Sequence, residues 1–442
     1  MLLPADPALP TLPAALDPNR VAAALDAALT ARPGAVTRVR DCRLERFRYR
    51  KAERAILLYR LRLAEANGER PSFLAGHLYP GEKARALGRK HEAKAAPSAR
   101  SWDGGYLPEM RLFAQLFPQD RRLPGLAPLV DRLLHRPEEV LADAAVGNAA
   151  PSEILPVRWR PGLCATLRLS WPGTQHRLYA KVYPDAAASG AAFAEHRAFA
   201  GALRATGGPL DAAAPCAHLP DFGAVLIEEV PGRPLDALVA DGGPAAVDAG
   251  GQVARALVHL HRAPVRLAGR RTAAQTVRAA EHGGRLLAWA VPALERRIGR
   301  LLRDVAEGLE EGFALPTHLD LKPDHLLLHE GRITVVDLDS AALSDPVADG
   351  AKLFARLQDA ERSARRATAA AAFLDAYRAA MPESWAARLP AHYACALLGL
   401  AVRALQHAEP DWPRRVANLL GRAERALAGE KDELLAGFED GG

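Results

Sequence analysis

A short acidic segment in the second half of the chain constrains the fold more than any other feature. Residues 316–345 read PTHLDLKPDHLLLHEGRITVVDLDSAALSD. Two short apolar runs, HLLL and RITVVDL, are joined by the turn HEGR, which predicts a β-hairpin. Asp320 precedes this hairpin, and Asp337 lies near the end of its second strand. The two carboxylates are therefore expected at the mouth of one cleft.

Two carboxylates in this arrangement suit phosphoryl transfer. One carboxylate orients the attacking hydroxyl and accepts its proton, and the other holds a divalent cation that neutralises charge on the phosphates. Each acid alone also fits a simpler interpretation, because Asp is common in turns and in solvated loops. The order and spacing of Asp320 and Asp337, rather than either residue alone, favour a phosphoryl-transfer site.

The segment resembles the catalytic loop of the aminoglycoside phosphotransferase and choline kinase group, small-molecule kinases built on a protein-kinase-like fold. The loop of that group, H-x-D-x-x-x-x-N, corresponds to HLDLKPDH here, with His318, Asp320 and, in place of Asn, His325. The resemblance implies that Asp320 positions the acceptor hydroxyl. It also implies that Asp337 and His325 hold Mg²⁺ or Mn²⁺, and the softer imidazole nitrogen of His325 favours manganese more than an amide oxygen would.

A second signature of the group, an apolar strand ending in Asp followed by a G-D-P-x-x-D-like stretch, corresponds to VVDLDSAALSDPVAD. Asp345 is expected to cap the following helix, and Asp349 is expected to brace the catalytic loop. His318 is expected to hold this loop by hydrogen bonds. Asp339 is either a second metal ligand or an acceptor in a turn.

The resemblance extends upstream to the nucleotide-binding residues of the group. Lys181 corresponds to the strand lysine that holds the α- and β-phosphates, and Glu195 corresponds to the helix glutamate that pairs with it. The stretch LIEEVPG corresponds to the hinge, where the carbonyl of Glu228 and the N–H of Val230 would bind the adenine. The implied nucleotide is ATP, with GTP as an alternative.

Self-comparison of the chain suggests that its first half contains a duplicated unit. RYRKAERAIL (48–57) aligns with RWRPGLCATL (158–167), HLYP (77–80) with KVYP (181–184), and LPEMRLFAQLFP (107–118) with LPDFGAVLIEEVP (219–231). The three matches occur in the same order, as expected for a repeat. Chance similarity in a chain rich in Ala and Arg is the alternative. The alignment places His77 where the second copy has Lys181.

The resemblance implies an α+β protein with a bilobal protein-kinase-like fold, and the repeat adds an extra degenerate copy of the nucleotide lobe at the N-terminus. The predicted domains are a degenerate repeat at 1–145 that serves as a cap or interface, a nucleotide-binding lobe at 146–232, and a helical lobe at 233–442. The first copy has no catalytic loop of its own and must bury its apolar face on the second copy or on another chain. A homo-oligomer through the repeat is one form of this interface.

The predicted function is ATP-dependent transfer of a phosphate to a hydroxyl of a small molecule. The alternative is a pseudokinase, a nucleotide-binding or structural protein whose His325 marks lost catalysis. Residues 262–304 contain ten arginines and three acids, which favours a sugar or another neutral or anionic acceptor over a polycationic aminoglycoside. The alternative for these arginines is a solvated helix face.

Composition and charge exclude several other classes of protein. The net charge of +6 comes from dispersed arginines, with no basic block such as marks a nucleic-acid arm, so we expect no nucleic-acid partner. No uninterrupted apolar run reaches transmembrane length, so we expect no membrane span. The four cysteines lie far apart and form no CxxC pair, which predicts free thiols and a cytoplasmic location.

Overall fold

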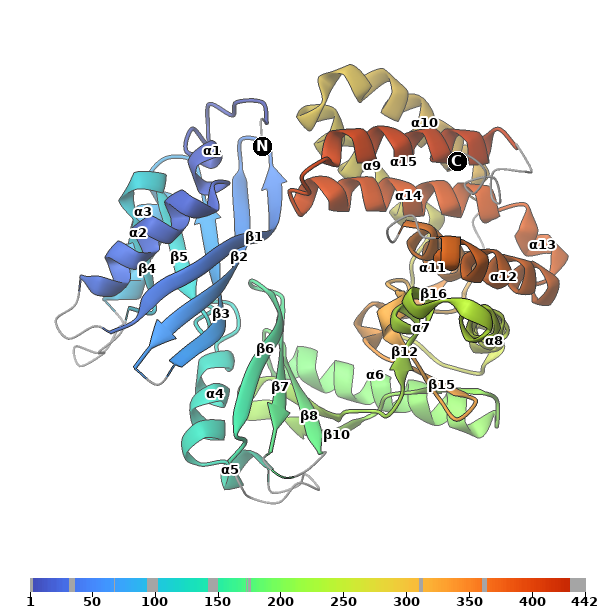
Figure 1. The fold of residues 1–442 in the computed structure, drawn as a ribbon, viewed down its shortest axis with the longest axis horizontal. Coiled ribbons are helices and arrows are strands. Elements are labelled where there is room, and N and C mark those ends of the chain that lie inside the picture. Colours follow the sequence, from blue (N-terminus) through green and yellow to red (C-terminus); the bar gives the residue numbers. More distant parts are fainter. Residues whose placement is uncertain are drawn as a thin grey trace. The chain divides into compact units, whose positions relative to one another are not determined.

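The computed structural model describes residues 3–31, 36–66, 68–93, 102–141, 150–171, 173, 176–309, 313–359 and 364–429 (Figure 1). The chain forms two compact units. The first unit contains residues 1–193, 215–229 and 406–410, and the second contains residues 194–214, 230–405 and 411–442. Sheets and helices occur together throughout, which confirms the expected mixture of α and β structure.

The first unit contains two five-stranded sheets. The first sheet has the order β1-β2-β3-β5-β4, with strands β1 (Arg38–Arg50), β2 (Arg54–Glu65), β3 (Gly68–Leu78), β4 (Gly104–Leu107) and β5 (Leu112–Leu116). The second has the order β6-β7-β8-β11-β10, with strands β6 (Glu153–Arg160), β7 (Cys164–Ser170), β8 (Arg177–Val182), β10 (Pro215–Leu219) and β11 (Ala224–Glu228). The two strand orders are the same when the strands are counted along the chain.

The elements between the strands also correspond. A helix follows the third strand of each sheet, α3 (Lys83–Glu92) in the first and α6 (Ala186–Ala205) in the second. Helices α1 (Leu12–Ala15) and α2 (Pro18–Thr30) precede β1, as α4 (Leu126–His135) and α5 (Glu138–Leu141) precede β6. His77 and Lys181 are each the residue before the last of the third strand, and they pair with Phe113 and Val225 of the next strand.

The same aspartate contact holds the first hairpin of each sheet. Asp6 Oδ2 accepts hydrogen bonds from the Tyr49 hydroxyl (2.6 Å) and the Ala52 N–H (2.9 Å). Asp120 Oδ2 accepts from Trp159 Nε1 (3.0 Å) and the Gly162 N–H (2.7 Å). The hairpin residues Ala52 and Gly162 both have left-handed backbones, with φ of 56° and 71°. A turn of this shape leaves its N–H without a strand partner, and the aspartate satisfies it.

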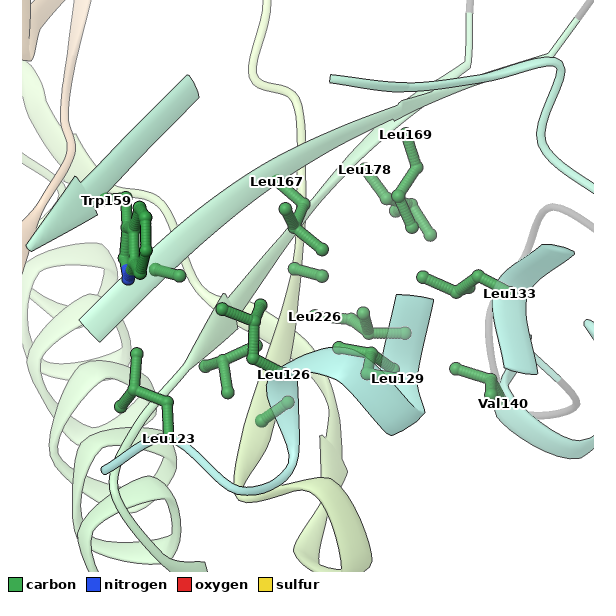
Figure 2. Packing of buried hydrophobic residues seen from close by; sticks show 14 of the residues in the cluster. Leu123, Leu126, Leu129, Leu133, Val140, Trp159, Leu167, Leu169, Leu178 and Leu226 are labelled. Carbon is green, nitrogen blue, oxygen red and sulfur yellow. The ribbon is translucent and has the colours of Figure 1, made fainter. Parts of the chain in front are cut away.

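Helix α4 covers one face of the second sheet. Leu126, Leu129 and Leu133 recur every third or fourth residue, so they form one apolar face of the helix. They belong to a buried cluster with Leu167, Leu169, Leu178 and Leu226 of the second sheet and with Leu58, Phe73, Ala75 and Phe117 of the first repeat. Figure 2 shows the α4 leucines projecting toward the leucines of the sheet. Apolar side chains of the first sheet, of α4 and of the second sheet are therefore buried in one cluster.

The second unit consists mostly of helices, and its few strands are short (Figure 1). Besides residues 194–205 of α6, its helices are α7 (Leu235–Asp241), α8 (Gly243–Arg262), α9 (Ala273–Ala290), α10 (Glu295–Gly308), α11 (Val347–Asp359), α12 (Ala364–Ala380), α13 (Glu383–Ala386), α14 (Leu389–Gln406) and α15 (Trp412–Leu427). Helix α9 begins with a capping box, in which Thr272 and Gln275 exchange side-chain and backbone hydrogen bonds. Over the described ranges, no helix combines the length and apolar character needed to cross a membrane.

Two small sheets in this unit position the acidic segment. The predicted hairpin forms from β14 (Leu326–His329) and β15 (Arg332–Val335), which pair with β12 (Arg233–Pro234) and β9 (Leu210–Ala212) in the order β12-β14-β15-β9. Strand β15 ends earlier than the sequence predicts, because Asp337 has a left-handed backbone with φ of 63°. The second sheet pairs β13 (Leu315–Thr317) with β16 (Ala342–Ser344). The catalytic loop predicted from the sequence leaves β13 and enters β14.

Candidate active site

The loop after β13 is fixed from below by one buried aspartate. Asp349, in the first turn of α11, accepts hydrogen bonds from the backbone N–H groups of His318 (2.6 Å) and Leu319 (2.8 Å). Leu319 has a left-handed backbone, with φ of 63°, which a branched residue adopts only where its surroundings hold it. Asp349 therefore has the bracing role expected from the sequence.

His318 also has its expected structural role. Its Nε2 lies 3.0 Å from the Val336 carbonyl, and its Nδ1 accepts from the N–H of Asp320 at 3.3 Å. Since Nδ1 accepts, the proton is assigned to Nε2, which donates to the carbonyl. The His318 side chain thus joins the loop to the segment before Asp337.

Asp320 lies in a strongly cationic environment. Lys322 Nζ is 3.3 Å from Asp320 Oδ2. Burial raises the pKa of Asp320, but Lys322, Lys352, His325 and Arg356 lower it by more, so the net pKa is below its usual value. Asp320 is therefore ionised at neutral pH and can accept a hydrogen bond from a hydroxyl group.

His325 and Asp337 meet across the loop, and the N–H of Val336 donates to the His325 carbonyl. Nε2 of His325 is 3.7 Å from Asp337 Oδ2 and 3.2 Å from Lys322 Nζ. Burial and the nearby Lys322 charge lower the pKa of His325 to about 4, so the imidazole is neutral near pH 7. A lysine ammonium can only donate, so the Nε2 lone pair faces this space.

These two side chains fit a metal ion that takes its remaining ligands from a bound phosphate. Among the described residues, no three or more His, Cys, Asp or Glu side chains gather to hold a metal by themselves. Mg²⁺ characteristically takes one or two carboxylates together with substrate phosphates and water. The Asp337 carboxylate and the lone pair of neutral His325 are suitable donors for such a site.

Asp339 lies next to a histidine of α6. Its Oδ1 is 3.5 Å from Nε2 of His196, a buried side chain. His196 directly follows Glu195, so the predicted phosphate-side helix also contributes the residue that contacts Asp339. Asp339 thus has a side-chain neighbour at ion-pair distance, which neither of its two predicted roles included.

The residues predicted to bind the nucleotide do not all belong to the same unit. Lys181 is buried on β8, where it lies between Thr166 of β7 and Val225 of β11. Glu228 is the last residue of β11, and Val230 is the first residue of the second unit in that part of the chain. Glu195 is half-buried on α6 within the second unit. The pairing of Lys181 with Glu195 stays a prediction.

Three cations near Asp320 were not identified from the sequence. Lys322 lies two residues after Asp320, and this closeness in the sequence could have suggested that the two side chains interact. Lys352 and Arg356 lie on α11, and Lys352 Nζ donates to the Leu319 carbonyl. Their positions depend on how α11 packs against the loop, which no local pattern reveals.

Asp345 holds the segment that follows β16. Its Oδ1 accepts from the N–H of Val347 at 3.1 Å, which confirms the expected cap of α11. Its Oδ2 also lies 2.6 Å from Arg388 Nε and 3.0 Å from His392 Nε2. Burial raises the pKa of Asp345, but the hydrogen bonds from His392 and Arg388 together lower it by a larger amount. The net pKa therefore lies well below its usual range.

Replacing Asp345 with alanine should lower the free energy of unfolding by about 3–5 kcal/mol, because Arg388 would remain buried without its carboxylate. Urea denaturation at pH 7 measures this loss. The stabilisation is present above the unfolded pKa of about 3.9 and is lost as the pH falls below it. Asp375→Ala, on an exposed position of α12, is the control and should change stability by less than about 0.5 kcal/mol. Equal losses in both variants would contradict the assignment.

The chain that carries this site matches a known protein family. The model of the phosphotransferase enzyme family (APH) matches residues 165–388. A search of curated proteins found no match. Similar solved structures include a choline/ethanolamine kinase family protein from Mesorhizobium loti (14% identity, 72% of this chain and 100% of that chain covered, TM-score 0.45). They also include the choline kinase LicA from Streptococcus pneumoniae (13% identity, 66% and 97% covered, TM-score 0.43).

Proposed function

Because the chain belongs to the phosphotransferase enzyme family, we propose that it transfers the γ-phosphate of ATP to a hydroxyl group of a small molecule. The observation that carries this proposal is the environment of Asp320. Its ionised carboxylate lies in a loop braced by Asp349, and Lys322 connects it to the pair formed by His325 and Asp337. A carboxylate that orients the hydroxyl, next to a site for a phosphate-bound cation, is the arrangement that phosphoryl transfer requires.

On the nucleotide side, Lys181 binds the α- and β-phosphates, and Glu195 orients it. The Glu228 carbonyl and the Val230 N–H bind the adenine, and GTP is the alternative nucleotide. In support, Lys181 is a buried lysine on β8, next to the last residue of the strand. Asp337 and His325 hold Mg²⁺ or Mn²⁺, which supplies neutralisation of the phosphate charge when bound.

The acceptor is a sugar or another neutral or anionic small molecule rather than a polycationic aminoglycoside. The arginines of residues 262–304 give this proposal less support than their number suggests, because all but Arg271 and Arg297 are exposed. Arg297 is engaged by Glu424, with two hydrogen bonds of 2.7 Å. The cations beside Asp320 support it more directly.

The first repeat is a degenerate copy of the nucleotide lobe that acts as a cap or as a homo-oligomer interface. Its strand order, its aspartate-held hairpin and the replacement of the strand lysine by His77 support this proposal. The domain limits are 1–145, 146–232 and 233–442. The location is the cytoplasm, with which four free cysteines are consistent. The protein uses no nucleic-acid or membrane partner.

The test is metal-dependent phosphate transfer. Purified protein, radiolabelled ATP and either Mg²⁺ or Mn²⁺ are incubated with sugars, amino alcohols and aminoglycosides, and labelled products are separated. We expect a labelled acceptor whose formation stops when EDTA removes the metal. Nucleotide binding without any metal-dependent turnover would instead favour the pseudokinase alternative, which the family match does not support.

The duplicated aspartate contact offers a matched pair of variants. Asp120→Ala and Asp6→Ala each leave two hairpin donors without their acceptor, so each should lower the free energy of unfolding by about 1–3 kcal/mol. Only the Asp120 hairpin belongs to the proposed nucleotide lobe, so only Asp120→Ala should raise the KM for ATP. Hydrogen exchange at Gly162 and Ala52 checks that each hairpin loosens. Equal KM values in both variants would contradict the role of the second hairpin.

A further inference from the structure

One face of α11 runs along the catalytic loop. Asp349, Lys352 and Arg356 are spaced by three and four residues, so they lie on the same side of the helix. The first two contact the loop directly, since Asp349 accepts from its backbone N–H groups and Lys352 donates to the Leu319 carbonyl. Arg356 is therefore one turn further along the face that the loop covers.

Arg356 is a half-buried guanidinium with unused hydrogen-bonding capacity. Its Nε is buried and has no hydrogen-bond partner within the part of the chain that the structure describes. Burial lowers the pKa of Arg356, and the nearby carboxylates of Asp320 and Asp324 offset part of this effect. A buried donor without an acceptor is costly, so a ligand that supplied one would be favoured.

Further cations surround this position. The charges of Lys322 and Lys352 lower the pKa of Asp320. Arg271 likewise lowers the pKa of Lys352, and Arg403 lowers the pKa of Arg356. Of the carboxylates nearby, Asp324 is exposed, and two others already have partners. Asp349 binds the loop backbone, and Asp359 is paired with Arg415 at 2.5 Å. A molecule that brings a hydroxyl to Asp320 would come close to Lys322, Lys352 and Arg356, whose charges all lower the pKa of Asp320.

We propose that the acceptor carries a carboxylate or phosphate group and that Arg356 binds this group while Asp320 orients the reacting hydroxyl. This inference rests on the proposed function and names the chemical class of its substrate. A guanidinium presents parallel N–H donors that match two oxygens of a carboxylate or phosphate, and the unused Nε is one of them. A cationic acceptor would instead need carboxylates at this place.

The reaction balances for such an acceptor. The hydroxyl oxygen forms a bond to the γ-phosphorus of ATP, and the bond between that phosphorus and the β–γ bridging oxygen breaks. The hydroxyl proton passes to Asp320, and ADP leaves. The anionic group of the acceptor takes no part in bond changes, so Arg356 acts in binding and orientation only.

The first test uses the unaltered protein and pairs of acceptors that differ in charge. Glycerate and glycerol, gluconate and glucitol, and glycerol 3-phosphate and glycerol are compared as substrates with ATP and Mg²⁺ or Mn²⁺. Choline and kanamycin serve as cationic probes. We expect at least one hydroxy-anion to have a kcat/KM at least tenfold above that of its neutral counterpart. A panel in which no anion exceeds its neutral counterpart, or in which a cation is preferred, overturns the proposal.

The second test compares Arg356→Gln with Arg378→Gln, an exposed arginine on α12. For the preferred hydroxy-anion, Arg356→Gln should raise the acceptor KM at least tenfold, with little change for the neutral counterpart and for ATP. Arg378→Gln should leave all three values unchanged. Arg356→Lys, which keeps the charge but loses the planar fork, should recover part of the loss. An unchanged acceptor KM in a folded Arg356→Gln protein, verified by thermal unfolding, overturns the assignment.

Failure of this inference differs from failure of the proposed function. Metal-dependent transfer to neutral or cationic acceptors alone would keep the kinase and remove the anionic substrate. Absence of metal-dependent transfer to every acceptor, together with no metal-dependent nucleotide binding, would remove both.

Discussion

Replacing Asp320 with asparagine should abolish phosphate transfer and leave nucleotide binding nearly unchanged. Asparagine keeps the shape of the side chain but cannot accept a proton, and the pKa of Asp320 lies below its usual value, so the native group is a carboxylate at working pH. Loss of a positioned proton acceptor costs about 10²–10⁴-fold in rate. The proposed adenine and phosphate contacts come from other residues, so the affinity for ATP should persist.

Steady-state kinetics and equilibrium binding of ATP separate the two effects. The expected result is a fall in kcat without a matching rise in the dissociation constant for ATP. Asp375→Asn makes the same chemical change on an exposed position of α12 and is the control. Turnover by Asp320→Asn at the rate of the parent would remove Asp320 from the catalytic role.

The proximity of the residues in the predicted catalytic loop could be expected because they lie close together in sequence. Asp320, His325 and Asp337 flank one hairpin, and a hairpin returns the chain to its starting point whatever surrounds it. Asp349 lies only a few residues after this hairpin, in the first turn of α11, so its bracing role could also be predicted. The expected structural roles of His318 and Asp345 followed from the same stretch of chain.

Residues brought together by helix packing could not be predicted in this way. Arg388 and His392 meet Asp345 from α14 and the residue before it, and the charge of Arg356 on α11 lowers the pKa of Asp320. Amphipathic periodicity indicates which face of a helix is buried, but it does not indicate which polar groups lie opposite that face. In the region 262–304 all but two of the arginines are exposed, as the alternative of a solvated helix face predicts.

The two five-stranded sheets show another limit of sequence comparison. Alignment identified matching segments around Tyr49 and Trp159 but not the aspartates that hold the hairpins formed there. Asp6 and Asp120 lie in short segments, PADPAL and PQDRRL, that share only Pro, Asp and Leu. Their equivalence depends on hydrogen bonds to hairpins 43 and 39 residues further along the chain, and these became apparent only in the folded protein.

Deleting residues 1–145 should give insoluble or severely destabilised protein. The deletion removes α4 and α5, whose side chains form a buried cluster with Leu167, Leu169 and Leu178 of the second sheet. Uncovering a contiguous apolar face of this kind promotes aggregation. Expression yield in the soluble fraction and the urea midpoint of any soluble protein measure the effect. A soluble truncation with the stability and activity of the whole chain would mean that the first repeat is an independent appendage.

A point-mutant pair tests the same packing without removing a domain. Leu129→Ala should lower the free energy of unfolding by about 2–5 kcal/mol, because the side chain is fully buried between α4 and its neighbours. Leu134 is on the same helix but is 52% exposed, so Leu134→Ala should cost less than about 0.5 kcal/mol. Both substitutions have the same effect on helix propensity, so the difference between them isolates the contribution of packing. A difference near zero would mean that α4 contributes little to the second sheet, and the deletion should then be tolerated.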